Sequence, residues 1–401
     1  MLTLCQTFLS HLNKSSLSIK KKLVFMVFAM SVNQISIPLK LRKADIFIAQ
    51  HSEATIPTLE LISCDRSHKR YDICSRNGPT IMNPTKSTFH VVDPTSTSSS
   101  PMTVSEKIRP YPRKWETNLM SSHIKELTLL VTSSQLDVRC DIHHRNSALV
   151  FSSGGYTRNP YHGFDDGFIP LFVTLRTTYP SNENQPILVL SPYPIINLDN
   201  ETSTHCFPSA TVGLISHGFM TIDPTLLPNS ETLHDFRVLL ETAYAKTAST
   251  STPQPRLVVV SRSGENVGRV MSNEGEVVVL AKEIGFDVTV FEPTKFTSLI
   301  KAYRLLNNTY AMMGVCYGKP AKEIGLDYLE YKIKVNESTL VHKYGEFSMV
   351  LKDPKSTAKK DWSIIKKIYL KEQDVRVNLV RFENYFTKAY KKAKKFMDKV
   401  G

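Results

Sequence analysis

A regular alternation of β-branched and amphipathic segments between residues 256 and 315 constrains the fold of this chain most. Short apolar runs bounded by turn residues predict three strands, and the two segments between them have the composition of helices. The predicted strands are Arg256–Val260, Asp287–Phe291 and Ala311–Val315, and the predicted helices are Glu274–Ile284 and Phe296–Leu306. Because strands joined through helices pair in parallel, this region predicts half of a Rossmann-like sheet and an α/β fold class.

Helix signals support this assignment. Asn273, followed three residues later by Glu276, predicts a capping box, and Gly285 predicts a left-handed end for the same helix. A later helix over residues 379–396 has one apolar face and a lysine-rich end. We interpret it as a packed helix with a solvated basic end, with a nucleic-acid or membrane tether as the alternative.

Ligands of parallel sheets bind outside the carboxyl ends of the strands. Ser261 and Arg262 follow the first predicted strand, and Gly314 lies near the end of the third. Since arginine neutralises phosphate groups, these three residues are candidate ligands of a diphosphate. An exposed loop arginine without such a role is the alternative interpretation of Arg262.

The stretch from Ala148 to Phe172 predicts a ligand pocket. Its first residues predict a buried strand, and Gly154 and Gly155 then allow a sharp turn with positive φ. Four polar residues follow at the predicted start of the next helix, where side chains face the crevice above a sheet: Asn159, His162, Asp165 and Asp166. The alternative without a binding role is that the two carboxylates stabilise a helix N-terminus and that His162 is a hydrogen-bonded structural histidine.

Other segments of the first half also predict an α/β layer. Strands are expected over 127–131 and 187–190, and helices over 166–176 and 231–246. The polar, threonine-rich and proline-marked segment Lys246–Pro255 is the best domain boundary in the sequence. We therefore expect two domains, and a chain of 401 residues with 41% hydrophobic content can build both cores.

The net charge of +13 favours an anionic partner such as nucleic acid, a phospholipid surface or a diphosphate. The chain has no recognisable nucleic-acid module, so we expect no nucleic-acid partner. The six cysteines lack the paired spacing of a zinc site, and we expect no metal. They suit disulfides in an oxidising lumen, although free buried thiols explain them equally well: Cys5, Cys64, Cys74, Cys140, Cys206 and Cys316.

The N-terminus predicts entry into the secretory pathway. Three lysines at 20–22 precede the apolar run Leu23–Leu39, which predicts a type II signal anchor. The strongly apolar part is short, so a signal sequence or an incorrect N-terminus are alternatives. If the rest of the chain is lumenal, three tripeptides are glycosylation acceptors, at Asn200, Asn307 and Asn336.

Several ordered blocks resemble glycosyltransferase family 61, whose plant members decorate xylan. The blocks are CDRSHKRYDIC from Cys64, KIRPYPRK from Lys107, the GGYTRNPYHGFDD pocket block, HCFPSATVGL from His205, Ser261-Arg262, and AKEIGLDYLEY from Ala321. The resemblance implies a GT-B architecture of two Rossmann-like domains. It also implies inverting, metal-independent transfer of a pentose, xylose or arabinose, from a UDP-sugar to a cell-wall polysaccharide in the Golgi lumen.

Under this resemblance, the chain divides into five parts. They are a cytoplasmic tail (1–22), the anchor (23–39), a stem and leading segment (40–105), an acceptor-side domain (106–246) and a nucleotide-sugar-side domain with a C-terminal helix (256–401). Asp166 is the first candidate for the general base, and His162 is the alternative or its orienting partner. Asn159, Gly154 and Gly155 are expected to line the acceptor pocket.

The chain departs from the family pattern at the junction of Val315 and Cys316. Family members continue with a His-Gly-Ala-Gly-Leu-Thr-Asn segment and a further strand, whereas only a short segment here precedes a predicted strand over 326–333. A glycine-rich turn lets backbone N–H groups approach phosphates. We therefore expect an incomplete second domain and poor transfer, or an impaired protein that binds sugar or nucleotide without turnover.

Overall fold

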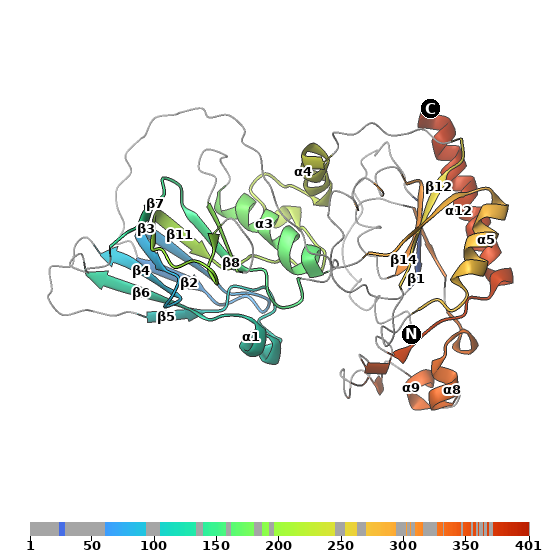
Figure 1. Ribbon diagram of the computed structural model, residues 1–401, viewed down its shortest axis with the longest axis horizontal. Coiled ribbons are helices and arrows are strands. Elements are labelled where there is room, and N and C mark those ends of the chain that lie inside the picture. The colour runs from blue at the N-terminus through green and yellow to red at the C-terminus, as the bar shows by residue number, and fades with distance from the viewer. Residues whose placement is uncertain are drawn as a thin grey trace. The chain divides into compact units, whose positions relative to one another are not determined.

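The chain folds as two units, residues 37–238 and residues 1–36 together with 239–401 (Figure 1). We call them the mixed-sheet unit and the parallel-sheet unit. Both combine a sheet with helices, so the predicted α/β class is confirmed. The computed structural model describes residues 24–28, 61–93, 105–133, 139–157, 162–179, 187–191, 196–244, 253–262, 270–293, 302, 305, 309–315, 327–331, 333–345, 348–353, 356–357, 360, 364, 367–368 and 372–400.

The mixed-sheet unit contains a ten-stranded sheet in which β10-β9-β8-β11-β3-β4-β6-β5 are successive neighbours, β2 pairs with β3, and β7 pairs with β11. The strands are β2 (Ile62–Asp65), β3 (Ile73–Asn83), β4 (Thr88–Asp93), β5 (Ser105–Ile108), β6 (Leu127–Ser133), β7 (Ile142–His143), β8 (Ala148–Ser152), β9 (Ile187–Ser191), β10 (Ile196–Asn197) and β11 (His205–Val212). The helices are α1 (Thr117–His123), the π-helical turn η2 (Gly163–Phe168), α3 (Ile169–Thr178) and the 3-10 turn η4 (Pro224–Leu226). Helix α4 (Leu233–Tyr244) begins in this unit and ends in the other.

Antiparallel pairs interrupt this sheet. β3 pairs antiparallel with β2, β4 and β11, whereas β8 pairs in parallel with β9 and β11. The predicted strands β6, β8 and β9 are confirmed, with ends within two residues of the expected ones. Since a Rossmann sheet is wholly parallel, a Rossmann-like sheet is not confirmed in this unit.

Strand β8 is buried on both faces, which explains why its sequence is a continuous apolar run. Ala148 and Val150 pack in one apolar cluster, and Leu149 and Phe151 pack in another that includes Leu171 of α3. The strand is therefore fixed from both sides. The turn that follows the carboxyl end of β8 leads into the candidate site.

The parallel-sheet unit has five strands, all parallel, in the order β13-β12-β14-β1-β15. They are β1 (Val24–Phe28), β12 (Arg256–Val260), β13 (Asp287–Phe291), β14 (Ala311–Val315) and β15 (Asp327–Glu330). The helical elements are α5 (Glu274–Ile284), the 3-10 turn η5 (Val335–Glu337), α8 (Leu340–Tyr344), α9 (Met349–Lys352) and α12 (Leu379–Val400). The predicted bounds of β12, β13, β14 and α5 are confirmed, and the predicted helix Phe296–Leu306 lies largely outside the described residues.

The strand between β14 and β15 comes from the N-terminal part of the chain. Val24 of β1 pairs with Ala311 of β14 on one side and with Asp327 of β15 on the other. β1 therefore occupies the place where a strand following β14 would pair. The five residues of β1 belong to the run predicted as a signal anchor, and the rest of that run lies outside the described residues.

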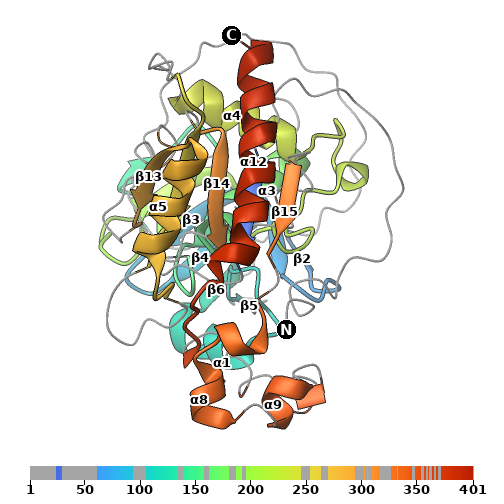
Figure 2. The ribbon, with the colours of Figure 1, turned by 90° about the vertical axis from the view of Figure 1, so that its right-hand side faces the viewer.

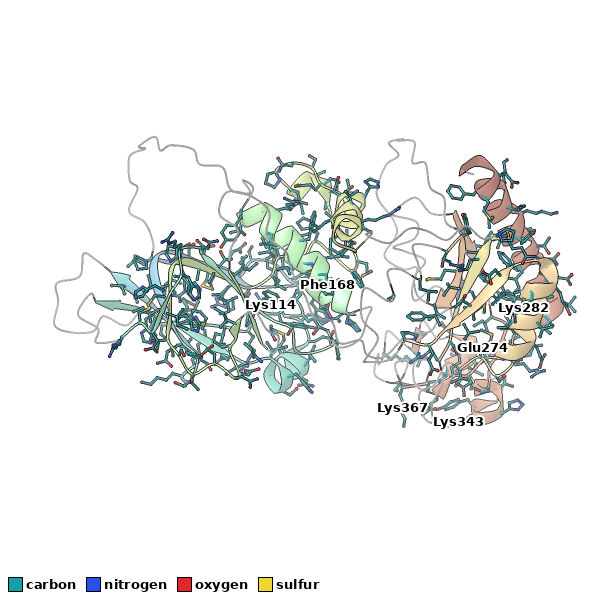
Figure 3. The ribbon with its side chains drawn as sticks, turned by 45° about the horizontal axis from the view of Figure 1, so that its top comes forward. Lys114, Phe168, Glu274, Lys282, Lys343 and Lys367 are labelled. Atoms are coloured by element: carbon teal, nitrogen blue, oxygen red, sulfur yellow. A yellow bond between two sulfur atoms is a disulfide. The ribbon has the colours of Figure 1, made fainter. Side chains whose placement is uncertain are left out.

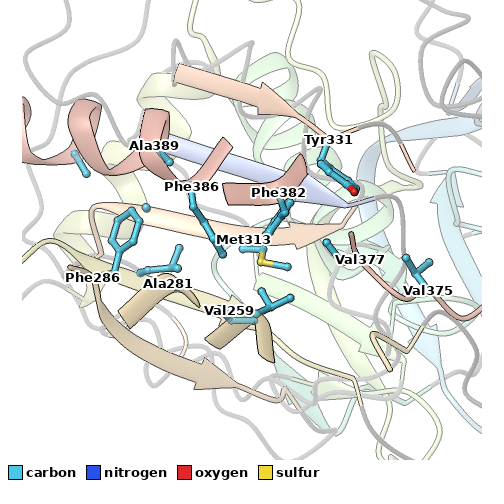
Figure 4. Packing of buried hydrophobic residues seen from close by; sticks show 14 residues of the cluster. Val259, Ala281, Phe286, Met313, Tyr331, Val375, Val377, Phe382, Phe386 and Ala389 are labelled. Carbon is cyan, nitrogen blue, oxygen red and sulfur yellow. The ribbon is translucent and has the colours of Figure 1, made fainter. Parts of the chain in front are cut away.

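Helices α5 and α12 lie side by side against this sheet (Figure 2). The ring of Phe286 contacts the rings of Phe386 and Tyr390 of α12, with centroids 6.2 and 5.2 Å away. Gly285 ends α5 in the predicted left-handed conformation, and a Cβ there would lie 2.9 Å from the Tyr390 hydroxyl. Phe382 and Phe386 fill the centre of this core (Figure 4).

The predicted capping box at Asn273 is wrong. The Asn273 side chain makes no cap hydrogen bond to its own helix. Its amide instead donates to the Val377 carbonyl and accepts from the Val377 N–H, both at 2.9 Å. A distant segment therefore satisfies the side chain that local sequence assigns to the helix.

Four of the six cysteines form two disulfides, Cys64–Cys74 and Cys140–Cys206. The first links β2 to β3, and the second links the strand β11 to the residue two positions before β7. Cys5 and Cys316 lie outside the described residues. No helix in the described ranges has the length and apolar character needed to cross a membrane.

Candidate active site

The turn after β8 positions the residues of the candidate site. Gly155 has a φ of +58°, which confirms the predicted positive φ, and a Cβ there would lie 2.9 Å from Cζ of Tyr111. The absence of a side chain at Gly155 therefore lets the Tyr111 ring approach the turn. A Cβ at Gly154 would lie 3.2 Å from the His123 carbonyl oxygen, so both glycines are closely packed. Asn159 lies outside the described residues.

The chain then enters η2, a π-helical turn that presents Asp165 and Asp166 to the interior. The helix was predicted to begin at Asp166, but α3 begins at Ile169 and η2 precedes it. Such turns distort the regular helical spacing of side chains and often occur at functional sites. Both carboxylates are buried, with 0% and 1% of the side chain exposed.

Arg113 joins the two carboxylates. Its Nε donates to Asp166 Oδ2 at 2.8 Å, and one terminal nitrogen lies 3.2 Å from Asp165 Oδ2. Its other terminal nitrogen donates to Glu116 Oε1 at 2.6 Å. Figure 3 labels two residues of this region, Lys114 next to Arg113 and Phe168 at the end of η2. One buried cation is thus shared by three acidic side chains.

Asp166 also contacts a phenol hydroxyl and an imidazole. The Tyr111 hydroxyl donates to its Oδ2 at 2.9 Å, and His162 Nδ1 lies 3.1 Å from the same oxygen. His162 Nδ1 also lies 2.9 Å from Arg113, so the tautomer decides whether it donates to Asp166 or accepts from Arg113. The structure therefore brings the two predicted catalytic residues together, and the His162 side chain is one-quarter exposed.

The two neighbouring carboxylates titrate differently. Burial, together with the negative charge of Asp166, raises the pKa of Asp165 to about 7. Burial also opposes ionisation of Asp166, but its hydrogen bond with His162 and the charge of Arg113 outweigh that cost and lower its pKa below the ordinary value. Asp166 is therefore the ionised partner, and Asp165 takes up a proton as the pH falls through about 7.

The cluster also has the composition of a cation site. His162, Asp165 and Asp166 offer ligand atoms within 4.8 Å of one another. The Arg113 guanidinium already contacts both carboxylates, so a positive charge is supplied there by the chain itself. A second group, Cys140, His143 and Cys206, has both thiols in a disulfide and cannot offer them to a metal.

Sequence reasoning missed Arg113, Tyr111 and Glu116 as site residues. They lie about 50 positions before η2, and nothing in their local pattern distinguishes them from other polar residues. Only the KIRPYPRK block of the family resemblance contains two of them, and no role was assigned to it. A buried charge cluster of this kind is visible only once the fold brings the segments together.

The candidate donor residues lie in the parallel-sheet unit. Ser261 is buried at the carboxyl end of β12, where its N–H donates to the Phe291 carbonyl at 2.9 Å, and Arg262 follows it. Gly314 lies in the neighbouring strand β14, one residue before its end, with Val260 side-chain atoms 3.4 Å from where its Cβ would be. The structure thus places the three residues at one edge of the sheet.

Of the three glycosylation tripeptides, two lie among the described residues. The side chains of Asn200 and Asn336 are exposed, as attachment of a glycan requires. Asn307 lies outside the described residues.

No protein-family model matches the chain. It is 35% identical to "Xylan glycosyltransferase MUCI21" of Arabidopsis thaliana, over 83% of this chain and 80% of that protein. Two proteins of Oryza sativa subsp. japonica are also similar. "Beta-1,2-xylosyltransferase XYXT1" is 29% identical over 82% of this chain and 83% of its own length, and "Alpha-1,3-arabinosyltransferase XAT3" is 28% identical over 80% and 63%. The chain therefore belongs to the family of plant glycosyltransferases that these proteins represent, and it is a transferase.

Proposed function

We propose that the protein transfers a pentose, xylose or arabinose, from a UDP-sugar to a cell-wall polysaccharide such as xylan, with inversion at the anomeric carbon. The relatives are named as a xylan glycosyltransferase, an α-1,3-arabinosyltransferase and a β-1,2-xylosyltransferase, which supports the substrate class. The observation that carries the chemistry is the buried cluster of Arg113, Asp166 and His162. Two α/β units, one with a wholly parallel sheet, support a GT-B arrangement.

Inverting transfer is a single displacement. The acceptor hydroxyl loses its proton to a base while its oxygen attacks the anomeric carbon, and the bond from that carbon to the diphosphate oxygen breaks. The bonding electron pair leaves with the UDP. One base near the acceptor is therefore sufficient, and the leaving diphosphate requires positive charge.

His162 suits the role of the base better than Asp166, the first candidate from sequence. The Asp166 side chain is 1% exposed and its Oδ2 is already engaged by Tyr111 and Arg113. His162 is one-quarter exposed and can present Nε2 to a hydroxyl when Nδ1–H donates to Asp166. The ionised Asp166 then holds the ring in this tautomer and stabilises the imidazolium that forms on proton uptake.

The leaving group is assigned to the parallel-sheet unit. Arg262 lies past the carboxyl end of β12, the edge at which ligands of parallel sheets bind, and an arginine there neutralises a diphosphate. With arginine cations in both units, the proposed transfer uses a UDP-sugar without a metal cofactor. Ser261 and Gly314 remain candidate donor ligands at the same edge.

We place the catalytic part in the Golgi lumen. Two disulfides suit an oxidising compartment, and Asn200 and Asn336 are exposed for glycosylation. A tagged protein should then carry glycans that an endoglycosidase removes. An unglycosylated cytosolic product would contradict this location.

A second function has one observation in its favour. Only residues 316–326 separate β14 from β15, and the place between these strands is taken by β1. A protein that binds nucleotide-sugar without turnover would fit a donor edge altered in this way. Measuring both UDP-sugar binding and UDP release separates the two functions.

The test of the base assignment uses His162→Gln and Asp166→Asn in the purified full-length chain, which keeps β1 in the parallel sheet. Both should reduce kcat for transfer to xylan oligosaccharides by about a hundredfold or more while UDP-sugar binding is retained. His234→Gln, an exposed histidine in α4, is the matched control and should keep full activity. Normal turnover by His162→Gln would refute the assignment.

A further inference from the structure

Trp115 is an unusual surface residue. With 42% of its surface exposed, it is the one exposed ring among the Phe, Tyr and Trp residues whose side chains the structure describes. It lies in the turn before α1, where the Glu116 N–H donates to the Arg113 carbonyl at 2.8 Å. Large aromatic rings left exposed next to polar groups are typical of binding surfaces.

The ring is exposed but held in place. Phe219 meets it edge to face, with centroids 5.8 Å apart and an interplanar angle of 83°. The guanidinium carbon of Arg70 lies 4.7 Å from its centroid, and Arg70 is itself buried, with Nε donating to Ser216 Oγ at 3.3 Å. A ligand that stacks on Trp115 therefore meets a ring that has already lost its rotamer freedom.

The ring is also close to the proposed base. The guanidinium carbon of Arg113 lies 5.5 Å from the Trp115 ring, and a terminal nitrogen of the same group lies 2.9 Å from His162 Nδ1. Trp115 and His162 therefore both contact one fixed guanidinium.

We propose that Trp115 is a stacking platform for a pyranose residue of the acceptor polysaccharide, next to the residue that receives the new sugar. The ring C–H bonds of a pyranose form an apolar face that packs on a flat indole, while its hydroxyls stay solvated. The inference rests on the proposed function for the identity of the chain bound. A stacked uracil of the donor is the competing occupant, but the candidate donor residues lie in the other unit.

Fluorescence tests binding without turnover, because the chain has only two tryptophans, Trp115 and Trp362. In a Trp362→Phe protein, Trp115 is the sole indole reporter. Titration with xylan oligosaccharides should change its emission saturably, and titration with UDP should not. A response to UDP alone would overturn the inference and indicate that Trp115 binds the uracil of the donor. Absence of a response to the oligosaccharides would also overturn it.

Kinetics supply the second readout. Trp115→Ala should raise KM for the oligosaccharide about tenfold, with little change in kcat or in KM for the UDP-sugar, and Trp115→Phe should restore most of the loss. Unchanged acceptor KM in a folded Trp115→Ala protein would overturn the inference and leave the proposed function standing. Saturable quenching by oligosaccharide in a protein that never transfers pentose would support the inference and refute the proposed function.

Discussion

Asp165 and Asp166 are neighbours in sequence, but their surroundings give them different charge states. Asp165 accepts the Met220 N–H at 2.5 Å and lies 3.2 Å from Arg113, whereas Asp166 contacts Arg113, Tyr111 and His162. The pKa of Asp165 is raised to about 7 and that of Asp166 is lowered. The two adjacent carboxylates therefore differ in charge, because Asp166 is ionised at neutral pH and Asp165 takes up a proton as the pH falls through about 7.

Because the two carboxylates differ in charge, Asp165→Asn is a matched control for Asp166→Asn. Asp166→Asn should reduce kcat about a hundredfold or more, because the charge that holds the His162 ring and stabilises its protonated form is lost. Asp165→Asn should keep most of the activity, because an amide resembles the protonated carboxyl. Steady-state kinetics on xylan oligosaccharides check the pair, and equal losses in the two variants would contradict the assigned roles.

The raised pKa of Asp165 predicts a pH effect on stability. Between the ordinary pKa of 3.8 and about 7, the folded protein keeps a proton that the unfolded chain has released. The contribution of Asp165 to stability is therefore complete below about pH 4 and is lost as the pH rises through about 7. Thermal unfolding at about pH 5 and about pH 8 should show Asp165→Asn gaining stability relative to the original protein at the higher pH. A pH-independent difference would contradict the raised pKa.

At the scale of elements, the turn after β8 controls the cluster through Tyr111. A Cβ at Gly155 would lie 2.9 Å from Tyr111 Cζ, and the Tyr111 hydroxyl donates to Asp166. Gly155→Ala should displace this ring and lower kcat about tenfold or more. Gly345→Ala is the control, since Gly345 also has a positive φ, +75°, but nothing lies within 4 Å of its Cβ position. Similar activities for the two variants would show that Tyr111 is not positioned by this turn.

Strand β1 makes a second prediction at this scale. Met26 pairs with Met313 on one side and Leu329 on the other, so it lies in the interior of the sheet. Proline there removes an N–H and disrupts the ladder, and Met26→Pro should lower the melting temperature by about 5 °C or more. Met26→Val keeps the N–H and is the matched control. Each variant is expressed with an added secretion signal. An unchanged melting temperature in Met26→Pro would show that β1 does not pair with β14 and β15.

The strands β12, β13 and β14 could be predicted from the sequence because each is a short apolar run between turn residues, whereas β1 was predicted as part of a signal anchor. Their order could not, because β1 is separated from β14 by most of the chain. The same limit explains Asn273, whose partner Val377 lies 104 positions away, and Arg113, which reaches Asp166 across 53 positions. His162 and Asp166 could be predicted to share one pocket because both follow the predicted strand and its glycine turn within a few residues.

At the scale of the whole molecule, the mixed-sheet unit holds the candidate base and the parallel-sheet unit holds the candidate donor ligands. We therefore propose that the acceptor binds to the mixed-sheet unit and the nucleotide-sugar to the parallel-sheet unit. Arg262→Ala should then raise KM for the UDP-sugar about tenfold or more and leave binding of xylan oligosaccharides to Trp115 unchanged. Weakened oligosaccharide binding in this variant would contradict the division.

The products of the reaction show whether the protein transfers a pentose from a UDP-sugar with inversion at the anomeric carbon. The purified full-length chain is incubated with UDP-xylose or UDP-arabinose and xylan oligosaccharides, and the products are analysed by mass spectrometry and by NMR of the anomeric proton. The account predicts addition of one pentose, in the anomeric configuration opposite to that of the UDP-sugar, and its loss in Asp166→Asn. Retention of configuration, or undiminished transfer by Asp166→Asn, would contradict it.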